Sequence, residues 1–232
     1  MVDNFFFIAL PYIALLLFIG GPIYRAFTGI KTANRGKMAW SARGDLLWTT
    51  RSSGFFGRAS VAPGALCIHW GLITVVVTHA IGFIGGAGGW PLLIDFFRWG
   101  GMFGGLLLLY GATWAFVRRL AMSQLRAMST LEDNVVLLFL IVMAGLGLYH
   151  SVVQVAFGVS YAVGPWLSSI FTLTPDSRLV AGAPLMVKLH MITVFIFMAY
   201  FPFTKLVHAF SFPFAYITRP YISMRSYVGL KK

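Results

Sequence analysis

Residues 185–208 read LMVKLHMITVFIFMAYFPFTKLVH, an apolar run that holds two histidines, His190 and His208, eighteen residues apart. A membrane-spanning helix needs about 20 mostly apolar residues, so this run is long enough to cross a bilayer. On an ideal helix, eighteen residues make five turns, which would place both histidines on one face about 27 Å apart. Histidine is costly inside a bilayer, so the pair indicates a functional site.

A second run, residues 62–84, reads APGALCIHWGLITVVVTHAIGFI and holds His69 and His79, ten residues apart. Ten residues rise about 15 Å along a helix and leave the two side chains about 80° apart around its axis, so they do not share an ideal face. Three further runs of spanning length are residues 4–24, 98–117 and 134–157. We therefore predict an all-α integral membrane protein, a single domain over residues 1–232 with five transmembrane helices.

Composition supports a lipid environment, because 59% of the residues are hydrophobic and only 10% are charged. Soluble domains have about 25% charged residues. The net charge of +12 does not indicate nucleic-acid binding, since the basic residues lie between the apolar runs. A single cysteine, Cys67, excludes an intrachain disulfide and an iron–sulfur cluster held by this chain. The first run lacks a basic leading region and a cleavage site, so we expect a retained helix.

Lysine and arginine are distributed unevenly about the five predicted helices. Fifteen lie on one side, seven of them in the loop 25–60, and the other side has only Arg98, Arg178 and Lys188. Basic residues are enriched in cytoplasmic loops. We therefore predict a multi-pass protein of the cytoplasmic membrane, with its N-terminus outside and its C-terminus in the cytoplasm.

The four histidines sort into pairs by depth, because the second and fifth helices run in opposite directions. His69 and His208 lie toward the cytoplasm, and His79 and His190 lie toward the outside. Each pair can bind one haem iron axially, which leaves no open position and favours electron transfer. Zinc fits less well, since no cysteine or acidic residue stands nearby to complete a four-ligand site. We predict two b-type haems, with the inner iron bound by His69 and His208 and the outer iron by His79 and His190.

These motifs resemble the respiratory nitrate reductase gamma subunit family. The resemblance rests on His69-Trp70-Gly71-Leu72 with His79 and Gly82, on Leu189-His190, and on Phe201-Pro202-Phe203-Thr204-Lys205-Leu206-Val207-His208 with Ser211, Pro213, Tyr216, Thr218 and Arg219. The histidine spacings, the chain length and the five spans also match. The resemblance implies that quinol is oxidised near the outer haem. Electrons then pass to the inner haem, to a cytoplasmic iron–sulfur subunit and to a molybdenum catalytic subunit that reduces nitrate.

The quinol site is less well defined by this resemblance. The family has a lysine just before the third helix, where this chain has Phe97 followed by Arg98. Arg98 binds either a quinone oxygen or a haem propionate, or lies at the interface as a snorkelling side chain. His150 in the fourth helix either accepts a quinol proton or packs against a neighbouring helix. Lys188 is a propionate partner or a surface anchor, and Asp95 is a candidate for proton release from the outer loop.

Two alternatives stay open at this point. The superfamily that this chain resembles includes membrane cytochromes linked to sulfite reductase and heterodisulfide reductase-like complexes, and the motif set does not exclude them. In such a complex, electrons from a sulfur- or nitrite-oxidising module could instead reduce quinone. A haem-free scaffold or small transporter would be a different class of protein. It predicts a colourless chain and leaves the four histidines unexplained. A cytochrome b of either kind is expected to contact membrane lipid and quinone.

Overall fold

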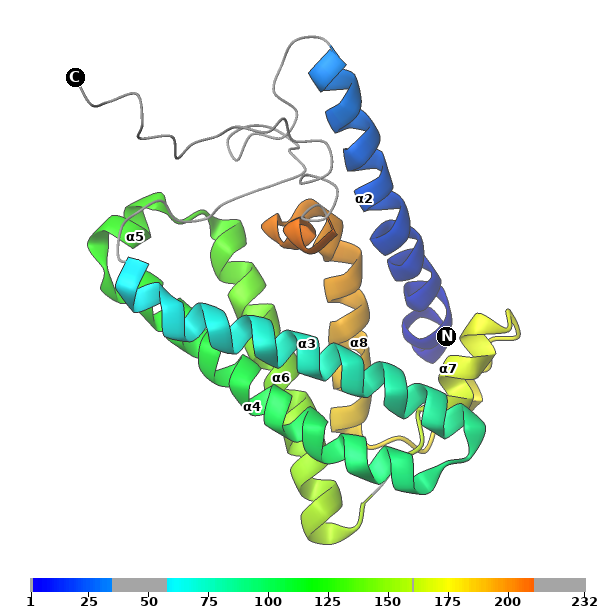
Figure 1. Cartoon of the computed structure of the whole chain (residues 1–232). Coiled ribbons are helices and arrows are strands. Elements are labelled where there is room, and N and C mark those ends of the chain that lie inside the picture. Colours follow the sequence, from blue (N-terminus) through cyan, green and yellow to red (C-terminus); the bar gives the residue numbers. More distant parts are fainter. Residues whose placement is uncertain (1, 35–57, 160, 211–232) are drawn as a thin grey trace, which may run out of the picture.

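The computed structural model describes residues 2–34, 58–159 and 161–210, and every regular element in that part of the chain is helical (Figure 1). The elements are α1 (Val2–Asn4), the π-helical turn η1 (Phe5–Ala9), α2 (Leu10–Asn34), α3 (Arg58–Gly88), α4 (Pro91–Ala121), α5 (Ser123–Met128), α6 (Leu131–Phe157), α7 (Gly164–Phe171), η2 (Ser177–Val180), α8 (Leu185–Tyr200), η3 (Phe201–Phe203) and η4 (Lys205–Val207). Five stretches within these are long and apolar enough to cross a membrane. The predicted all-α chain with five such helices is confirmed.

Several helices extend beyond the apolar runs that predicted them. α2 continues to Asn34, well into the predicted loop 25–60, and residues 35–57 of that loop lie outside the described residues. α4 begins at Pro91, seven residues earlier than predicted. Proline suits the first turn of a helix, because its fixed φ matches the helix and its missing N–H would be unpaired there. Asp95 therefore lies in α4, and its predicted place in the outer loop is wrong.

The fifth helix is shorter than predicted. α8 ends at Tyr200, and two 3₁₀ turns, η3 and η4, follow it. Pro202 explains the end, because proline lacks the N–H that continues the hydrogen-bond ladder and its ring clashes with the preceding turn. In Figure 1 the segment after α8 turns aside at the end of that helix. The expectation that His190 and His208 lie on one face of a continuous helix is therefore wrong.

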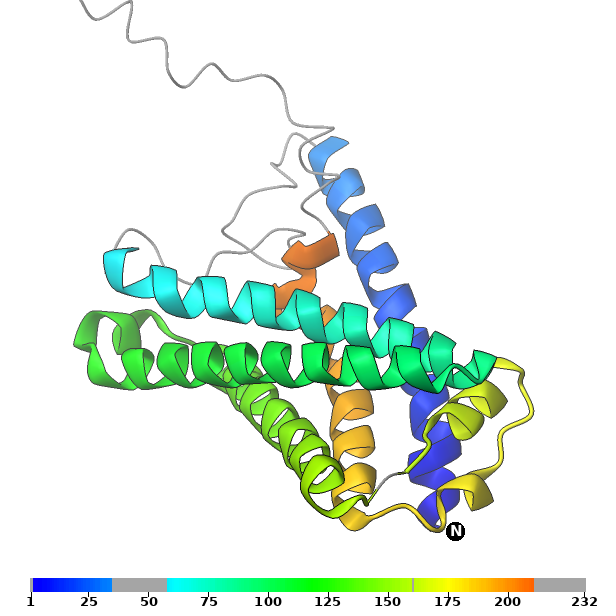
Figure 2. The same cartoon turned by 60° about the horizontal axis from the view of Figure 1, so that its bottom comes forward.

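α3 and α4 form a closely packed antiparallel pair (Figure 2). A Cβ added to Gly71 would lie 2.5 Å from the backbone nitrogen of Leu108, and one on Gly111 would lie 2.7 Å from that of Ile68. Only glycine permits backbones to approach so closely, as in other membrane helix pairs. Gly82, one turn beyond His79, has nothing within 4 Å of the same position. Helix packing explains Gly71, whereas Gly82 faces open space.

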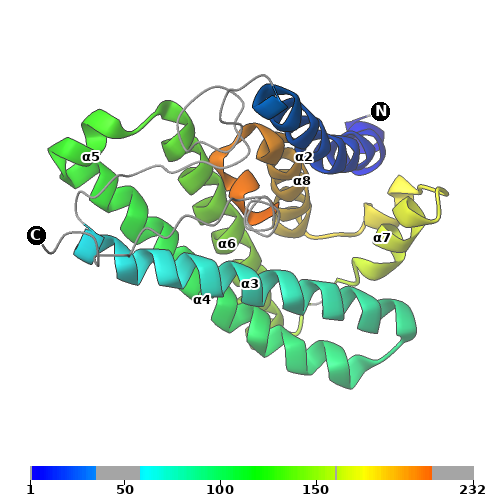
Figure 3. The same cartoon turned by 45° about the horizontal axis from the view of Figure 1, so that its top comes forward.

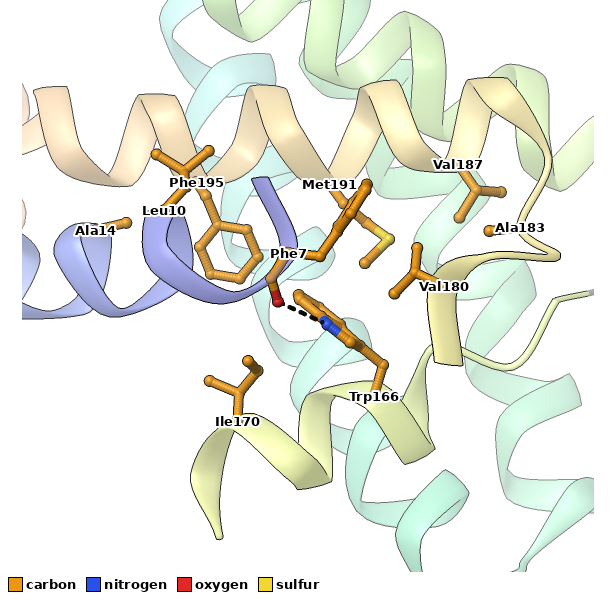
Figure 4. Close-up of a cluster of buried hydrophobic side chains, with 10 residues drawn as sticks. All are labelled: Phe7, Leu10, Ala14, Trp166, Ile170, Val180, Ala183, Val187, Met191 and Phe195. Carbon is orange, nitrogen blue, oxygen red and sulfur yellow. Dashed lines mark hydrogen bonds between the residues drawn. The ribbon is translucent and has the colours of Figure 1, made fainter. Parts of the chain in front are cut away.

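The remaining helices enclose α8. It packs against α2 on one side and α6 on the other, and α6 also packs against α4 (Figure 3). At one end, α7 and η2 pack against the start of the chain around Trp166, which is 1% exposed (Figure 4). Nε1–H of Trp166 donates to the carbonyl of Phe7, 3.0 Å away, and the Tyr12 hydroxyl donates to the carbonyl of Ile170. These contacts fix a cap over this end of the bundle.

Candidate functional site

The inner histidines face each other across the bundle. His69 projects from α3 and His208 from the segment after η4, and their ring centroids are 6.1 Å apart with 48° between the ring planes. Nδ1 of His69 lies 2.6 Å from the carbonyl oxygen of Ala65, and Nδ1 of His208 lies 2.8 Å from that of Lys205. A carbonyl oxygen can only accept, so each Nδ1 carries the proton and Nε2 is left as the metal-binding nitrogen.

The outer histidines form a second facing pair. The ring centroids of His79 in α3 and His190 in α8 are 6.4 Å apart, with 32° between the planes. Nδ1 of His79 donates to the carbonyl of Val75 at 2.8 Å. Nδ1 of His190 is buried beside the backbone of Met143, without a hydrogen bond of normal geometry among the described residues. A Cβ on Gly147 of α6 would lie 3.1 Å from Cε1 of His190, so the missing side chain leaves room for this ring.

These separations fit a metal ion held between two imidazoles. A metal-bound imidazole nitrogen lies about 2 Å from the ion and the ring centre about 1 Å behind it, so opposed ligands separate the ring centres by about 6 Å. No group of three His, Cys, Asp or Glu side chains that could hold a metal occurs among the described residues. Two imidazoles are too few for a bare zinc ion. Two imidazoles would be enough as the protein ligands of a haem, whose macrocycle supplies the other nitrogens.

The break after α8 resolves a mismatch in the predicted spacings. His69 and His79 are ten residues apart, whereas His190 and His208 are eighteen apart. α8 provides ten residues from His190 to Tyr200, about 15 Å and the same rise as on α3. The last eight residues turn aside instead of continuing along the axis. Both pairs can therefore meet, although His69 and His79 do not share an ideal face.

The predicted quinol residues lie near the outer pair. Arg98 lies in the third turn of α4 and not before it, and its Nη2 donates to Oδ1 of Asp95 at 2.5 Å. His150 lies in α6 three residues after Gly147, whose Cβ would lie 3.1 Å from Cε1 of His190. Arg98 lies in α4 two residues before Gly100, whose Cβ would lie 2.9 Å from Cγ2 of Thr78, the residue before His79. Lys188, in the first turn of α8, donates from Nζ to the carbonyl of Ala181 in the cap.

An apolar groove of about 520 Å³ lies between α3 and α4, on the face of α3 opposite His79. It is lined by Trp70, Ile73, Thr74, Val77 and Thr78 of α3 and by Phe96, Phe97, Trp99 and Gly100 of α4. Phe97, which stands where the resembled family has a lysine, is therefore part of an apolar wall. Arg98 follows it directly in the chain, but at 100° per residue its side chain leaves α4 on the face opposite the groove.

Polar side chains from α2 and α6 surround the break, and sequence reasoning missed their role. Arg25 of α2 is 7% exposed, and its Nη1 donates to the carbonyls of Pro202 and Thr204 at 2.6 and 3.2 Å. Oε1 of Glu132 accepts from the backbone N–H of Lys205 at 2.8 Å. Pro202, which lies between His190 and His208, was the available signal in the sequence. A proline interrupts a helix and leaves backbone carbonyls that need hydrogen-bond donors from elsewhere.

A buried carboxylate completes this group. Asp133 of α6 accepts from Nζ of Lys205 at 2.8 and 2.9 Å, and Nη1 of Arg119 in α4 lies 3.4 Å from it. Asp133 also forms the capping box of α6 with Thr130. In the sequence, Arg25 and Arg119 count only among the fifteen basic residues of the predicted cytoplasmic side, and Lys205 belongs also to the motif that carries the family resemblance. Their contacts show that these basic residues also hold together the end of the bundle at which α8 breaks.

The sequence of this chain is similar to those of known membrane proteins of one family. The family model described as nitrate reductase gamma subunit matches residues 3–227. The nitrate reductase gamma chain of Bacillus subtilis (strain 168) is 30% identical over 226 residues, covering 93% of this chain and 95% of the relative. The respiratory nitrate reductase 1 gamma chain of Escherichia coli (strain K12) is 27% identical over 241 residues, with 97% and 98% covered. The chain therefore belongs to the nitrate reductase gamma subunit family.

Proposed function

We propose that this chain is the di-haem cytochrome b anchor of a respiratory nitrate reductase and oxidises quinol near its outer face. The observation that supports this most is the presence of two facing imidazole pairs, with ring centroids 6.1 and 6.4 Å apart, in a member of this family. A haem held by two histidines has no open position, so it would take up and give up single electrons without binding oxygen.

The chain's own groups would hold the two cofactors in a defined orientation. His69 and His208 are the proposed inner ligands, and His79 and His190 the outer ligands. Three of the four donate Nδ1–H to a backbone carbonyl, which fixes the tautomer and directs Nε2 toward the iron. Gly147 leaves space behind His190, and Gly82 faces open space one turn from His79, where a flat macrocycle has room.

Quinol oxidation releases protons as well as electrons, so proton acceptors must lie beside the outer pair. His150 is the proposed acceptor, because imidazole titrates near neutral pH. Arg98 is the proposed donor to a quinol oxygen, and its ion pair with Asp95 fixes its direction and places a carboxylate toward the outer surface. Lys188, bonded to the cap, is proposed as a propionate partner or surface anchor.

The proposed orientation places the N-terminus and the cap outside and the basic end in the cytoplasm. Arg25, Arg119 and Lys205 lie together at that basic end, as their shared contacts with the break and Asp133 indicate. Basic residues beyond residue 210 lie outside the described residues. We propose that this end binds a cytoplasmic iron–sulfur subunit and, through it, a molybdenum catalytic subunit. The gamma chains named above favour nitrate reductase over a sulfite- or heterodisulfide-linked complex.

The test is the visible spectrum of the purified chain. The reduced protein should show a b-type spectrum with two haems per chain, and an added quinol should produce that spectrum without another reductant. A colourless protein would contradict haem binding. A protein that dithionite reduces but quinol does not would contradict quinol oxidation. Lys188→Ala separates its two roles, since a propionate partner should alter the outer haem spectrum and a surface anchor should leave it unchanged.

A further inference from the structure

The segment between α8 and His208 leaves backbone groups without their helical partners. In a continuous helix, the carbonyls of Pro202 and Thr204 would accept from the N–H groups four residues later. Here the N–H of Leu206 donates instead to the Thr204 hydroxyl at 3.1 Å, and the N–H of Lys205 turns to another helix. Unpaired backbone groups are costly in a bilayer, so this conformation needs donors and acceptors from outside the segment.

Arg25 supplies the donors. Its guanidinium reaches across from α2, and Nη1 donates to both freed carbonyls, of Pro202 and Thr204. α2 approaches the segment closely here, so that a Cβ added to Gly21 would clash with Cβ of Pro202. Thr204, which is 1% exposed, contributes a hydroxyl that donates to the carbonyl of Phe201 at 2.8 Å. One buried cation thus fixes the turn immediately after α8.

α6 supplies the acceptors, through two consecutive acidic residues. Glu132 accepts from the backbone N–H of Lys205, and Asp133 accepts from its ammonium group. The carbonyl of Lys205 in turn accepts from Nδ1 of His208 at 2.8 Å. Lys205 is therefore held at its backbone and its side chain by α6, and its own carbonyl orients the imidazole.

We propose that Arg25 and the Lys205–Asp133 ion pair are positioning residues for His208, which hold the broken end of α8 so that this imidazole meets His69. The proposal rests on the proposed function in taking His69 and His208 as haem ligands. The positioning role goes beyond the proposed function, because it concerns groups that would touch neither the iron nor the quinol. Because of the break, His208 lies closer to His190 along the bundle than eighteen helical residues would place it, which matches the ten-residue rise from His69 to His79. These side chains hold the break in place.

The test uses the full-length chain in the membrane with three changes, Arg25→Gln, Lys205→Ala and Asp133→Asn. Each should weaken retention of the inner haem by about 10-fold or more, the usual effect of removing a group that orients a metal ligand. Retention is measured as the rate of haem loss to an excess of an acceptor protein. The inner and outer components are separated by redox titration. The outer component should keep the retention and midpoint potential of the unmodified chain.

Matched controls separate positioning from general effects. Arg126→Gln removes an exposed cation from the same end of the bundle. Ser123→Ala removes an exposed hydroxyl of α5 that bonds Gln124 and touches neither Asp133 nor Lys205. Both should retain the inner haem as the unmodified chain does. Lys205→Arg, which can still pair with Asp133, should recover most of the retention lost in Lys205→Ala. If a variant does not accumulate, Arg25→Lys and Lys205→Arg are measured against the same controls.

The outcomes distinguish this inference from the proposed function. An unmodified chain without haem would overturn the proposed function itself. An unmodified chain with two haems, whose inner component is retained equally in Arg25→Gln, Lys205→Ala and the controls, would overturn only the positioning role. Equal loss of both components in Lys205→Ala would also overturn it, because the contacts described here reach only His208.

Discussion

Gly147 of α6 offers a quantitative test of the outer site, through the substitution Gly147→Ala. The added Cβ would lie 3.1 Å from Cε1 of His190. An ordinary carbon–carbon contact is about 3.5–4.0 Å, so the ring or the helix must move by about 0.4–0.9 Å. Metal–ligand distances tolerate only about 0.2 Å, so the outer ligand is displaced by more than the bond accepts. We expect outer haem retention to fall about 10-fold, which corresponds to about 1.4 kcal/mol.

Gly145→Ala is the matched control on the same helix. Residue 145 lies about 200° around α6 from residue 147, and a Cβ there has nothing within 4 Å. Both changes favour the helix by about 1 kcal/mol, because alanine has a higher helix propensity than glycine. The assay is the rate of haem loss, followed separately for the outer and inner components. If Gly147→Ala retains the outer haem as well as Gly145→Ala does, the assigned place of His190 is refuted.

Three further predictions concern packing, the cap and the quinol site. Gly71→Ala would put a Cβ 2.5 Å from the Leu108 nitrogen and should destabilise the α3–α4 pair by about 1–3 kcal/mol, measured by thermal unfolding. Gly20→Ala is the control, because a Cβ there has nothing within 4 Å and should not destabilise the protein. Trp166→Phe leaves a buried carbonyl without its donor and should cost about 1–3 kcal/mol, seen as faster proteolysis of the cap. Asp95→Asn should change stability by less than about 1 kcal/mol, because the pair is partly exposed, yet raise the KM for quinol. An unchanged KM would contradict the role of the ion pair.

Much of this architecture follows from sequence patterns that have a direct physical cause. Runs of about 20 apolar residues predict spans because a bilayer sets the length, and five such helices are present. The pairing of His79 with His190 followed from the opposite directions of two helices, and the structure places these rings face to face. Hydropathy predicted the ends of the helices less accurately, because α2 continues as far as Asn34 and α4 begins as early as Pro91, outside the apolar runs.

The break after α8 could not be placed by periodicity. Counting 3.6 residues per turn assumes an unbroken helix, and Pro202 invalidates that assumption for the last eight residues before His208. The partners of the break were also hidden, since Arg25 lies 177 residues from Pro202 along the chain. Such contacts depend on how α2 packs against α8. The spacing of residues in a single sequence does not predict such long-range contacts.

The central claim is that four histidines bind two haems as an inner and an outer pair, and alanine substitution of each ligand tests it most directly. Difference spectra and redox titrations of the four variants should fall into two classes. His79→Ala and His190→Ala should lose one and the same component, and His69→Ala and His208→Ala should lose the other. Loss of the same component in His69→Ala and His79→Ala, or of different components in His79→Ala and His190→Ala, would contradict the account.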